Sequence, residues 1–258
     1  MVLPAGRKLS RVEMFAAAQW LGDRPHTVLP AHALLTGRGQ AWIPPGDDPN
    51  DPRALLIRMD VAPAEPVGFG RDAEALACML TELDGWTHIN VGDALAQTLP
   101  PVIHTRTGRT LKPYGDLYFV LLTVGPSFTD PSVRLLGEDD IDLFVAAPPP
   151  VAAADRKTAA MILREGLCAG AIVGGQLVSR VQSYARTPRH ADLGAATAEA
   201  FRGRGLVTAC ASLLTDELRK RKIIPVWSCG EGNAPSRRVA EKLGFAPIAP
   251  RVYFAFSD

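Results

Sequence analysis

The sequence predicts a mixed fold of the α/β or α+β class, arranged in two parts. Its 258 residues suffice for one large or two small domains, and their hydrophobic share of 47% is ordinary for a globular protein. Segments with strand-like and helix-like patterns alternate, yet only some of them form strand–helix–strand units. A stretch rich in Gly, Pro and Ser at 125–132 interrupts this alternation. We therefore expect an N-terminal α/β domain at 1–125 and a second domain at 130–258.

In the first part, capping signals and apolar spacing define the expected elements. Ser10 followed by Glu13 forms a capping box and predicts a helix over 10–23. Asp72 is a candidate N-cap for a helix over 71–86. The remaining patterns predict strands at 54–61, 87–93 and 116–124 and a polar, basic loop at 103–115.

The second part shows the same mixture of patterns. Gly174 and Gly175 mark a hairpin turn within 161–185, which is expected to hold two or three strands. A helix is expected over 205–221, where apolar residues at three- and four-residue spacing form a core-facing stripe. The other expected elements are a short strand and an acidic helix in 133–147, a loop at 148–155, strands at 190–198, 224–230 and 251–256, and a helix over 233–245 capped by Asn233 and ended by Gly244.

The composition argues against several functional classes. With a formal net charge of +1, no global field would recruit nucleic acid or a membrane surface. No apolar run reaches the length of a membrane span, and the first residues lack the apolar core of a signal peptide. The four cysteines lie far apart and form no CxxC pair, which is typical of a reduced protein. We expect a cytoplasmic protein without a metal site, because no metal-ligand spacing is present.

The stretch FRGRGLVTA at 201–209 places two arginines and two glycines before the helix expected over 205–221. Anions bind readily at a helix N-terminus, where the first amide groups lack partners, and glycine lets a ligand approach the backbone closely. No Walker GxxxxGK motif is present, and a Rossmann turn is disfavoured because Thr208 stands where its third glycine belongs. Two interpretations stay open: a turn that binds a pyrophosphate, and a solvated basic loop before an ordinary helix.

The order of these motifs resembles the GNAT superfamily of acyl-CoA-dependent N-acyltransferases. Their signature R/Q-x-x-G-x-G/A lies between a strand and a helix and is followed by a strand and an N-x-x-S/A-x-x-x-x-x-K-x-G-F helix. Here FRGRGLVTACASLL is followed by PVWSCG and NAPSRRVAEKLGF in the same order and spacing. The resemblance centres on 190–246 and extends over 131–258. The P-x-W-x-C strand and the two-part chain look like the zwittermicin A resistance-type branch.

The resemblance implies a mixed, mostly antiparallel sheet flanked by helices, with residues 1–125 as an additional, degenerate GNAT-like half. It also implies acetyl-CoA as the acyl donor. Val207 replaces the second Gly/Ala of the motif, and Ala240 stands where many relatives carry a tyrosine general acid. The implied donor-binding residues are Phe201, Arg202, Gly203, Arg204, Gly205, Leu206 and Val207 on the loop, Ala196, Thr197 and Ala198 on the strand that binds the pantetheine arm, and Asn233 and Ser236 on the following helix.

The implied reaction is direct attack of a primary amine on acetyl-CoA in a ternary complex. It needs proximity, a donor to the developing oxyanion and a proton acceptor. Glu199 and Asp192 are candidate bases and Tyr253 is a candidate acid, although the two carboxylates also fit the role of plain surface acids. An acceptor site shaped by two halves suits a small-molecule amine, and a homodimer stays open. The alternative is a non-catalytic CoA-binding or regulatory module of the same fold.

Overall fold

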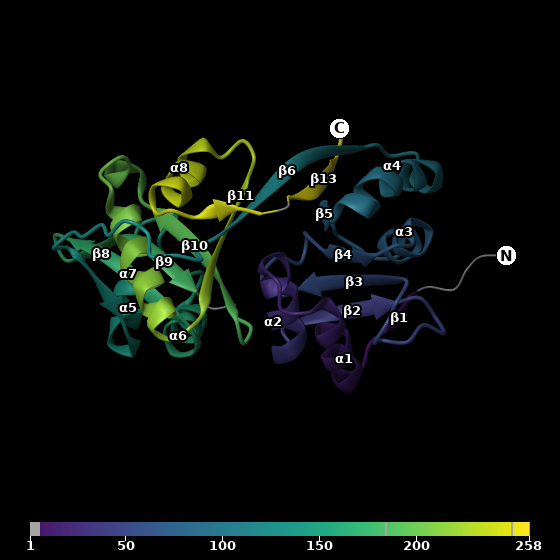
Figure 1. Cartoon of the computed structure of the whole chain (residues 1–258), viewed down its shortest axis with the longest axis horizontal. Coiled ribbons are helices and arrows are strands. Elements are labelled where there is room, and N and C mark those ends of the chain that lie inside the picture. Colours follow the sequence, from purple (N-terminus) through teal and green to yellow (C-terminus); the bar gives the residue numbers. More distant parts are fainter. Residues whose placement is uncertain (1–5, 184, 249, 258) are drawn as a thin grey trace. The chain divides into compact units, whose positions relative to one another are not determined.

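The computed structural model describes residues 6–183, 185–248 and 250–257. The chain divides into two compact units of mixed helix and strand. The first unit comprises residues 1–118, 230–232 and 249–258, and the second comprises 119–229 and 233–248. The unit boundary at residues 118 and 119 precedes the predicted break at 125–132, and the last strand of the chain belongs with the N-terminal elements (Figure 1).

The sheet of the first unit is antiparallel except for one parallel pair. Its strands lie in the order β1, β2, β3, β4, β5, β13 and β6, and only β4 and β5 run parallel. The predicted strands at 54–61, 87–93 and 251–256 are thereby confirmed. The bounds are Arg7–Lys8 (β1), Gly39–Ile43 (β2), Ala54–Met59 (β3), Val67–Gly70 (β4), His88–Val91 (β5), Arg251–Phe256 (β13) and Leu111–Val120 (β6), the last of which continues into the second unit.

Helices cover both faces of this sheet. Successive side chains of a strand point to opposite faces, so Leu55 packs in one core and Leu56 in another. The first core includes residues of α1 and α2, and the second includes residues of α3 and α4. Ser10 and Glu13 form the predicted capping box, and Asp72 is the predicted N-cap. The helices are Arg11–Leu21 (α1), Val28–Thr36 (α2), Ala73–Thr81 (α3) and Asp93–Thr107 (α4), with a short 3-10 turn at Pro25–Thr27 (η1).

The predicted loop at 103–115 is wrong. Helix α4 runs to Thr107, and β6 begins at Leu111, where it pairs with Phe256 of β13. The helix contains Pro100 and Pro101, which remove two backbone hydrogen-bond donors. Because proline disfavours a helix interior, the sequence pattern of this segment predicts no helix. Tertiary packing overrides this preference, because the apolar residues of α4 are buried against the second core at four-residue spacing. These residues are Leu95, Leu99 and Ile103.

The sheet of the second unit is also mostly antiparallel and contains one parallel pair among its described pairings. Strands β7, β8, β9 and β10 are antiparallel neighbours, and β11 runs parallel to β10. Gly174 and Gly175 form the predicted turn of the β8–β9 hairpin with φ values of 58° and 79°. The bounds are Val133–Leu136 (β7), Leu167–Val173 (β8), Gln176–Ser183 (β9), His190–Thr197 (β10), Ile224–Gly230 (β11) and Ala246–Pro247 (β12), the last pairing with the end of β6.

Helices cover both faces of this sheet as well. Arg180 lies over the ring of Phe144 of α5, and Phe144 packs in a core that includes described residues of α6 but none of α7. Helices α5 and α7 both contact β9 yet share no core among the described residues, so they cover different faces of the sheet. The helices are Ile141–Val145 (α5), Arg156–Glu165 (α6), Leu206–Lys220 (α7) and Ala234–Lys242 (α8), with 3-10 turns at Glu138–Asp140 (η2) and Glu199–Phe201 (η3).

The start of the predicted strands at 161–185 is wrong, because residues 161–165 complete α6. Asp155 caps this helix by accepting from the backbone N–H of Thr158 at 2.6 Å, and Ala159, Ile162 and Leu163 are buried. The continuous apolar run around Met161 reads equally well as a buried strand, since periodicity does not separate the two over a few residues. The Asp155 cap is the sequence signal that identifies the helix.

Candidate functional site

Strands β10 and β11 separate along their length. Their parallel ladder runs from His190 and Ile224 to Leu193 and Trp227, and no pairing between them is described beyond that point, although both strands continue. The other edge of β10 pairs with β9 as far as Thr197. The edge of residues 195–197 that faces β11 therefore has no strand partner in the described part of the chain, and its backbone groups can bind an extended ligand.

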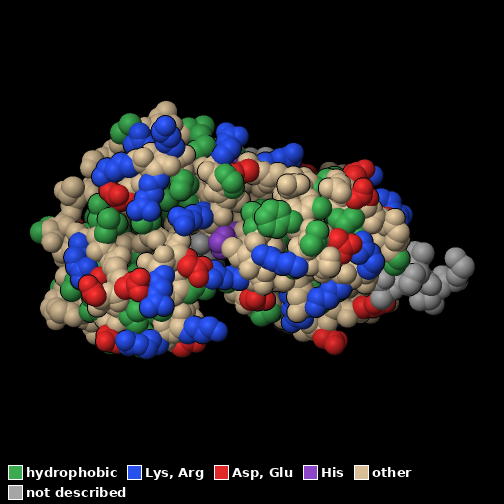
Figure 2. Space-filling model, turned by 90° about the horizontal axis from the view of Figure 1, so that it is seen from below, with side chains coloured by type: hydrophobic (Ala, Val, Ile, Leu, Met, Phe, Trp, Pro, Cys, Tyr) green, Lys and Arg blue, Asp and Glu red, His purple; other side chains and the backbone are tan. Residues whose placement is uncertain are grey.

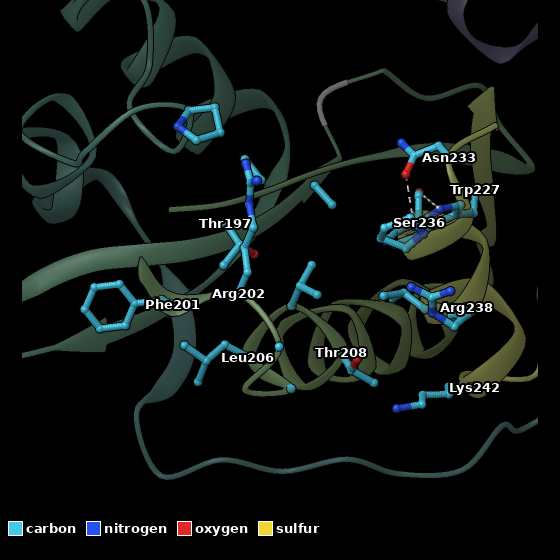
Figure 3. A pocket seen from close by; sticks show the side chains of 18 residues that line it. Thr197, Phe201, Arg202, Leu206, Thr208, Trp227, Asn233, Ser236, Arg238 and Lys242 are labelled. Atoms are coloured by element: carbon cyan, nitrogen blue, oxygen red, sulfur yellow. Dashed lines mark hydrogen bonds between the residues drawn. The ribbon is translucent and has the colours of Figure 1, made fainter. Parts of the chain in front are cut away.

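A pocket of about 580 Å³ opens at this separation (Figure 3). It collects backbone and side chains from β10, the 201–205 turn, the start of α7, β11 and α8. Figure 3 shows Phe201, Arg202 and Leu206 toward one end and Arg238 and Lys242 toward the other. The lining residues are Pro150, Ala195, Ala196, Thr197, Phe201, Arg202, Gly203, Gly205, Leu206, Val207, Thr208, Trp227, Asn233, Pro235, Ser236, Arg238, Val239 and Lys242.

The turn before α7 is shaped by two glycines with left-handed backbone. Gly203 has φ 75° and Gly205 has φ 82°, a region that other residues adopt at a cost. A Cβ atom at either position would meet no atom of the chain within 4 Å, so a side chain there would enter the pocket. Gly205 is the N-cap of α7 and provides no side-chain acceptor. The first amide groups of α7 consequently face an opening that the chain itself leaves unfilled.

The pocket is positively charged. Arg202, Arg238 and Lys242 line it, and none of its described lining residues is Asp or Glu. Arg204, also predicted to bind the donor, is not among the lining residues. Its guanidinium donates to the carbonyl of Ala200 at 2.9 Å and lies 4.8 Å from the ring centroid of Phe201. Cations together with a free helix N-terminus suit a phosphate group.

Helix α8 is held against β11 by a short chain of hydrogen bonds. The indole N–H of Trp227 donates to the hydroxyl of Ser236 at 2.9 Å, and the Ser236 amide donates to Asn233 Oδ1 at 3.2 Å. The predicted residues Asn233 and Ser236 thus lie at the pocket and also fix its wall. Trp227, Arg238 and Lys242 also line the pocket and were not predicted from the sequence. The spacing of Pro235, Arg238, Val239 and Lys242 on α8 is a signal that could have identified one lining face.

The proposed acid–base residues are not brought to this pocket. Glu199 is exposed on η3, and Asp192 is half-buried in the paired part of β10 opposite Val226. Tyr253 lies on β13 in the first unit, where its ring stacks on Tyr114 at 5.3 Å between centroids and burial raises its pKa. Ala198 is buried and likewise does not line the pocket. The described lining residues therefore supply no carboxylate or phenol.

Two buried cysteines are poor candidates for nucleophilic chemistry. Burial raises the pKa of both Cys168 and Cys210 to about 12, so neither is a thiolate at neutral pH. Within the described part of the chain, no group of three or more His, Cys, Asp or Glu could hold a metal ion. Among the described helices, none combines the length and the apolar character of a membrane span. On the face seen in Figure 2, basic and acidic side chains are interspersed.

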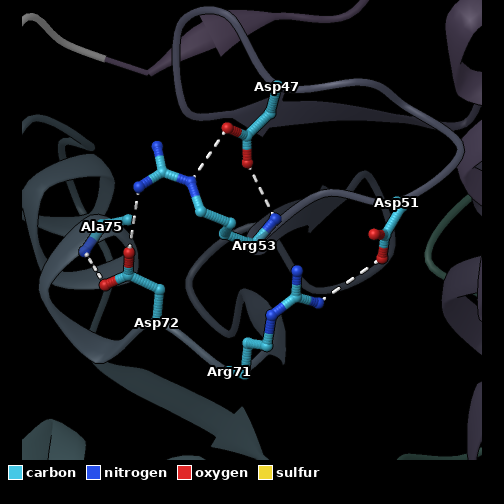
Figure 4. A network of polar contacts seen from close by, with 6 residues as sticks. All are labelled: Asp47, Asp51, Arg53, Arg71, Asp72 and Ala75. Atoms are coloured by element: carbon cyan, nitrogen blue, oxygen red, sulfur yellow. Dashed lines mark hydrogen bonds and ion pairs between the residues drawn. The ribbon is translucent and has the colours of Figure 1, made fainter.

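The first unit has the same local topology but a different helix N-terminus. Helix α3 connects the parallel strands β4 and β5, as α7 connects β10 and β11. Asp72 caps α3, and its carboxylate accepts from the amide of Ala75 at 3.0 Å (Figure 4). Arg53 bridges Asp47 and Asp72, and Arg71 pairs with Asp51. The chain's own carboxylate thus occupies the position that is open in the second unit.

Comparison with known proteins agrees with this geometry. Residues 157–253 match the family model described as GNAT acetyltransferase. No curated protein sequence matches the chain. A GCN5-related N-acetyltransferase-like protein from Streptococcus suis has a similar structure, with 19% identity, a TM-score of 0.63 and coverage of 95% of this chain and 99% of that one.

Two further solved structures are similar over nearly the whole chain. An acetyltransferase of the GNAT family from Colwellia psychrerythraea has 13% identity, a TM-score of 0.61 and coverage of 97% of this chain and 99% of its own. A tandem GNAT protein from the clavulanic acid biosynthesis pathway has 15% identity, a TM-score of 0.56 and coverage of 96% and 94%. The predicted fold class is confirmed by these likenesses, whereas the zwittermicin A resistance-type branch stays a prediction.

Proposed function

We propose that this chain, whose residues 157–253 match the GNAT acetyltransferase family, transfers an acetyl group from acetyl-CoA to the primary amine of a small molecule. The observation that carries this proposal is the pocket at the separation of β10 and β11. It combines an unpaired strand edge, a glycine turn at a helix N-terminus and three cations in one unit of the chain.

Each part of the pocket fits one part of a CoA thioester. The amides at Gly203, Gly205 and the start of α7 would bind the pyrophosphate, because Gly203 and Gly205 leave the space for it. Arg238 and Lys242 on α8 would add charge-assisted bonds to phosphate oxygens. The free edge of residues 195–197 would bind the amides of the pantetheine arm as an added strand does.

The proposed reaction depends mainly on backbone groups and on the thiolate leaving group, and little on catalytic side chains. The neutral amine attacks the thioester carbonyl, the C–N bond forms, and the C–S bond breaks with the electron pair leaving on the CoA sulfur. A backbone N–H at Ala196 or Thr197 would stabilise the developing oxyanion. A thiolate is a fairly good leaving group, so the buried Ala240, which carries no acid, is compatible with turnover. The amine proton would pass to solvent or to Glu199 or Asp192, which stay candidate bases.

The alternative function is a CoA-binding or regulatory module without turnover. The lack of a carboxylate among the described lining residues favours it. One experiment distinguishes the two functions. Acetyl-CoA is incubated with the protein and a panel of primary amines, the release of free CoA thiol is measured, and the products are identified by mass spectrometry. Amine-dependent release with acetylated product supports the enzyme. Binding of acetyl-CoA without amine-dependent release supports the module.

The first unit, the protein's compartment and its assembly are parts of the same proposal. Residues 1–125 would be a degenerate GNAT-like half, since α3 follows the same local topology but is capped by Asp72. A cytoplasmic protein fits the use of acetyl-CoA, and a homodimer stays an open assembly state.

A further inference from the structure

Arg180 lies next to the pocket on the side opposite to α7. It sits on β9 directly across from Ala196, which lines the pocket. Its guanidinium is 4.8 Å from the ring centroid of Phe144 on α5. Its Nε donates to the carbonyl of Val151 at 2.6 Å, and the preceding residue, Pro150, also lines the pocket. The Arg180 side chain therefore lies on the face of the sheet that α5 covers. Two pocket-lining residues are close to it in the fold: Ala196, its partner on β10, and Pro150, which precedes Val151.

The positive charge of Arg180 has no described counter-charge. The contacts described for the guanidinium are the Val151 carbonyl, the amide oxygen of Gln182 and the Phe144 ring, and all three are neutral. Burial lowers the pKa of Arg180, as expected for a cation removed from water. A guanidinium that is partly removed from water is costly unless it is paired, and two of the five N–H donors of Arg180 have a described acceptor. The remaining fork matches a carboxylate.

Residues of the pocket reach the face of the sheet that bears Arg180, although Arg180 does not itself line the pocket. Ala196 and Phe201 line the pocket and also pack against the core that contains Phe144. A thioester carried through the separation of β10 and β11 would thus reach the face that bears Arg180.

We propose that Arg180 binds a carboxylate of the acceptor, so that the substrate is a small amine that also carries a carboxylate. This inference rests on the proposed function. Gln182 is a positioning residue in it, because its amide oxygen accepts from Arg180 and holds the guanidinium in place.

The test compares amino acids with their primary amides in matched pairs: glycine with glycinamide, β-alanine with its amide, and 4-aminobutyrate with its amide. Rates are expressed per concentration of neutral amine, because the amide and carboxylate forms differ in amine pKa. The wild type is expected to favour one carboxylate over its amide by about 10- to 100-fold in kcat/KM, as for a charge-assisted pair. Arg180→Gln is expected to reduce this preference to about onefold, because it lowers the rate with the carboxylate far more than the rate with the amide.

Arg156→Gln is the matched control, since it removes an exposed arginine from the start of α6 in the same unit. It should retain the carboxylate preference. A role limited to packing would lower the rates with acid and amide equally in Arg180→Gln, and that result overturns the proposal. A wild type that does not prefer the carboxylate to the amide also overturns it. The same is true if Arg180 instead determines a preference for an acidic acyl donor such as succinyl-CoA. Calorimetric titration of acetyl-CoA into the same samples separates the two proposals. If acetyl-CoA binds, a negative result concerns Arg180 alone; if it does not bind, the proposed function fails as well.

Discussion

The indole N–H of Trp227 donates to the hydroxyl of Ser236 at 2.9 Å and so joins β11 to α8 across one wall of the pocket. Trp227 is 2% exposed, so its donor has little access to water. Ser236→Ala should lower the free energy of unfolding by roughly 1 to 3 kcal/mol, because it leaves a buried N–H without an acceptor. Urea unfolding measures this loss. Ser236→Thr retains a hydroxyl and should lose less, whereas equal losses in the two variants would argue against the bond.

Arg238 and Lys242 should contribute to CoA affinity through charge. Replacing either by Gln should weaken acetyl-CoA binding by about tenfold and reduce its dependence on salt. Titration calorimetry at two salt concentrations measures both effects. Lys220→Gln is the control, because Lys220 is exposed at the end of α7, pairs with Glu217 and does not line the pocket. Equal losses in Lys220→Gln would mean that only net charge matters.

The two helix N-termini should respond differently to loss of their caps. Asp72→Ala should destabilise the protein by about 0.5 to 2 kcal/mol and leave acetyl-CoA affinity unchanged, because Asp72 caps α3 in the first unit. Asn233→Ala should cost a similar amount of stability and also weaken acetyl-CoA binding, because Asn233 lines the pocket. Unfolding and binding are measured on the same samples. A loss of affinity in Asp72→Ala would contradict the assignment of binding to the second unit.

Asp116 should make stability depend on pH. Burial raises its pKa to about 6, and it accepts from the Asn90 amide at 3.1 Å. A carboxyl whose folded pKa lies above its unfolded value, about 4, binds more protons in the native state between these values. Its contribution is therefore largest below pH 4 and is lost as the pH rises to 6, by on the order of 2 to 3 kcal/mol.

Asp116→Asn should remove this dependence. The difference in unfolding free energy between wild type and variant is measured from pH 4 to 7, so that the titration of other groups cancels. Asp139→Asn removes an exposed carboxylate and should leave the pH profile unchanged. A difference between wild type and Asp116→Asn that does not change with pH would contradict the raised pKa.

Local signals were sufficient to predict much of this fold. Ser10, Asp72 and Asn233 cap the helices that they were expected to cap, since a cap depends on residues three positions away. The turn at Gly203 and Gly205 was located from its composition. Helix α4 was missed because Pro100 and Pro101 conceal a helix whose stability comes from packing. The apolar run around Met161 concealed α6 for a related reason.

The site could be predicted only in part. The loop and strand that we propose to bind the donor follow from a sequence motif, and most of their residues line the pocket. Arg238 and Lys242 reach it because α8 crosses beside β11, which depends on tertiary packing. The position of Tyr253 also depends on tertiary packing. Its strand β13 is at the end of the chain, yet it pairs with β5 and β6 of the first unit. Glu199 lies away from the lining because β10 ends at Thr197 and Glu199 begins a 3-10 turn.

The most direct test of the central claim is calorimetric titration of acetyl-CoA into the wild type and the Gly205→Glu and Gly175→Glu variants. Both glycines have positive φ, 82° and 79°, and open space at the Cβ position, so the two substitutions place a side chain in a similar backbone conformation. Only Gly205 lines the pocket, where a glutamate would fill the pyrophosphate position with negative charge. We expect binding in the wild type and in Gly175→Glu and none in Gly205→Glu. A wild type that does not bind acetyl-CoA, or a Gly205→Glu variant that binds it as tightly as the wild type, would contradict the account.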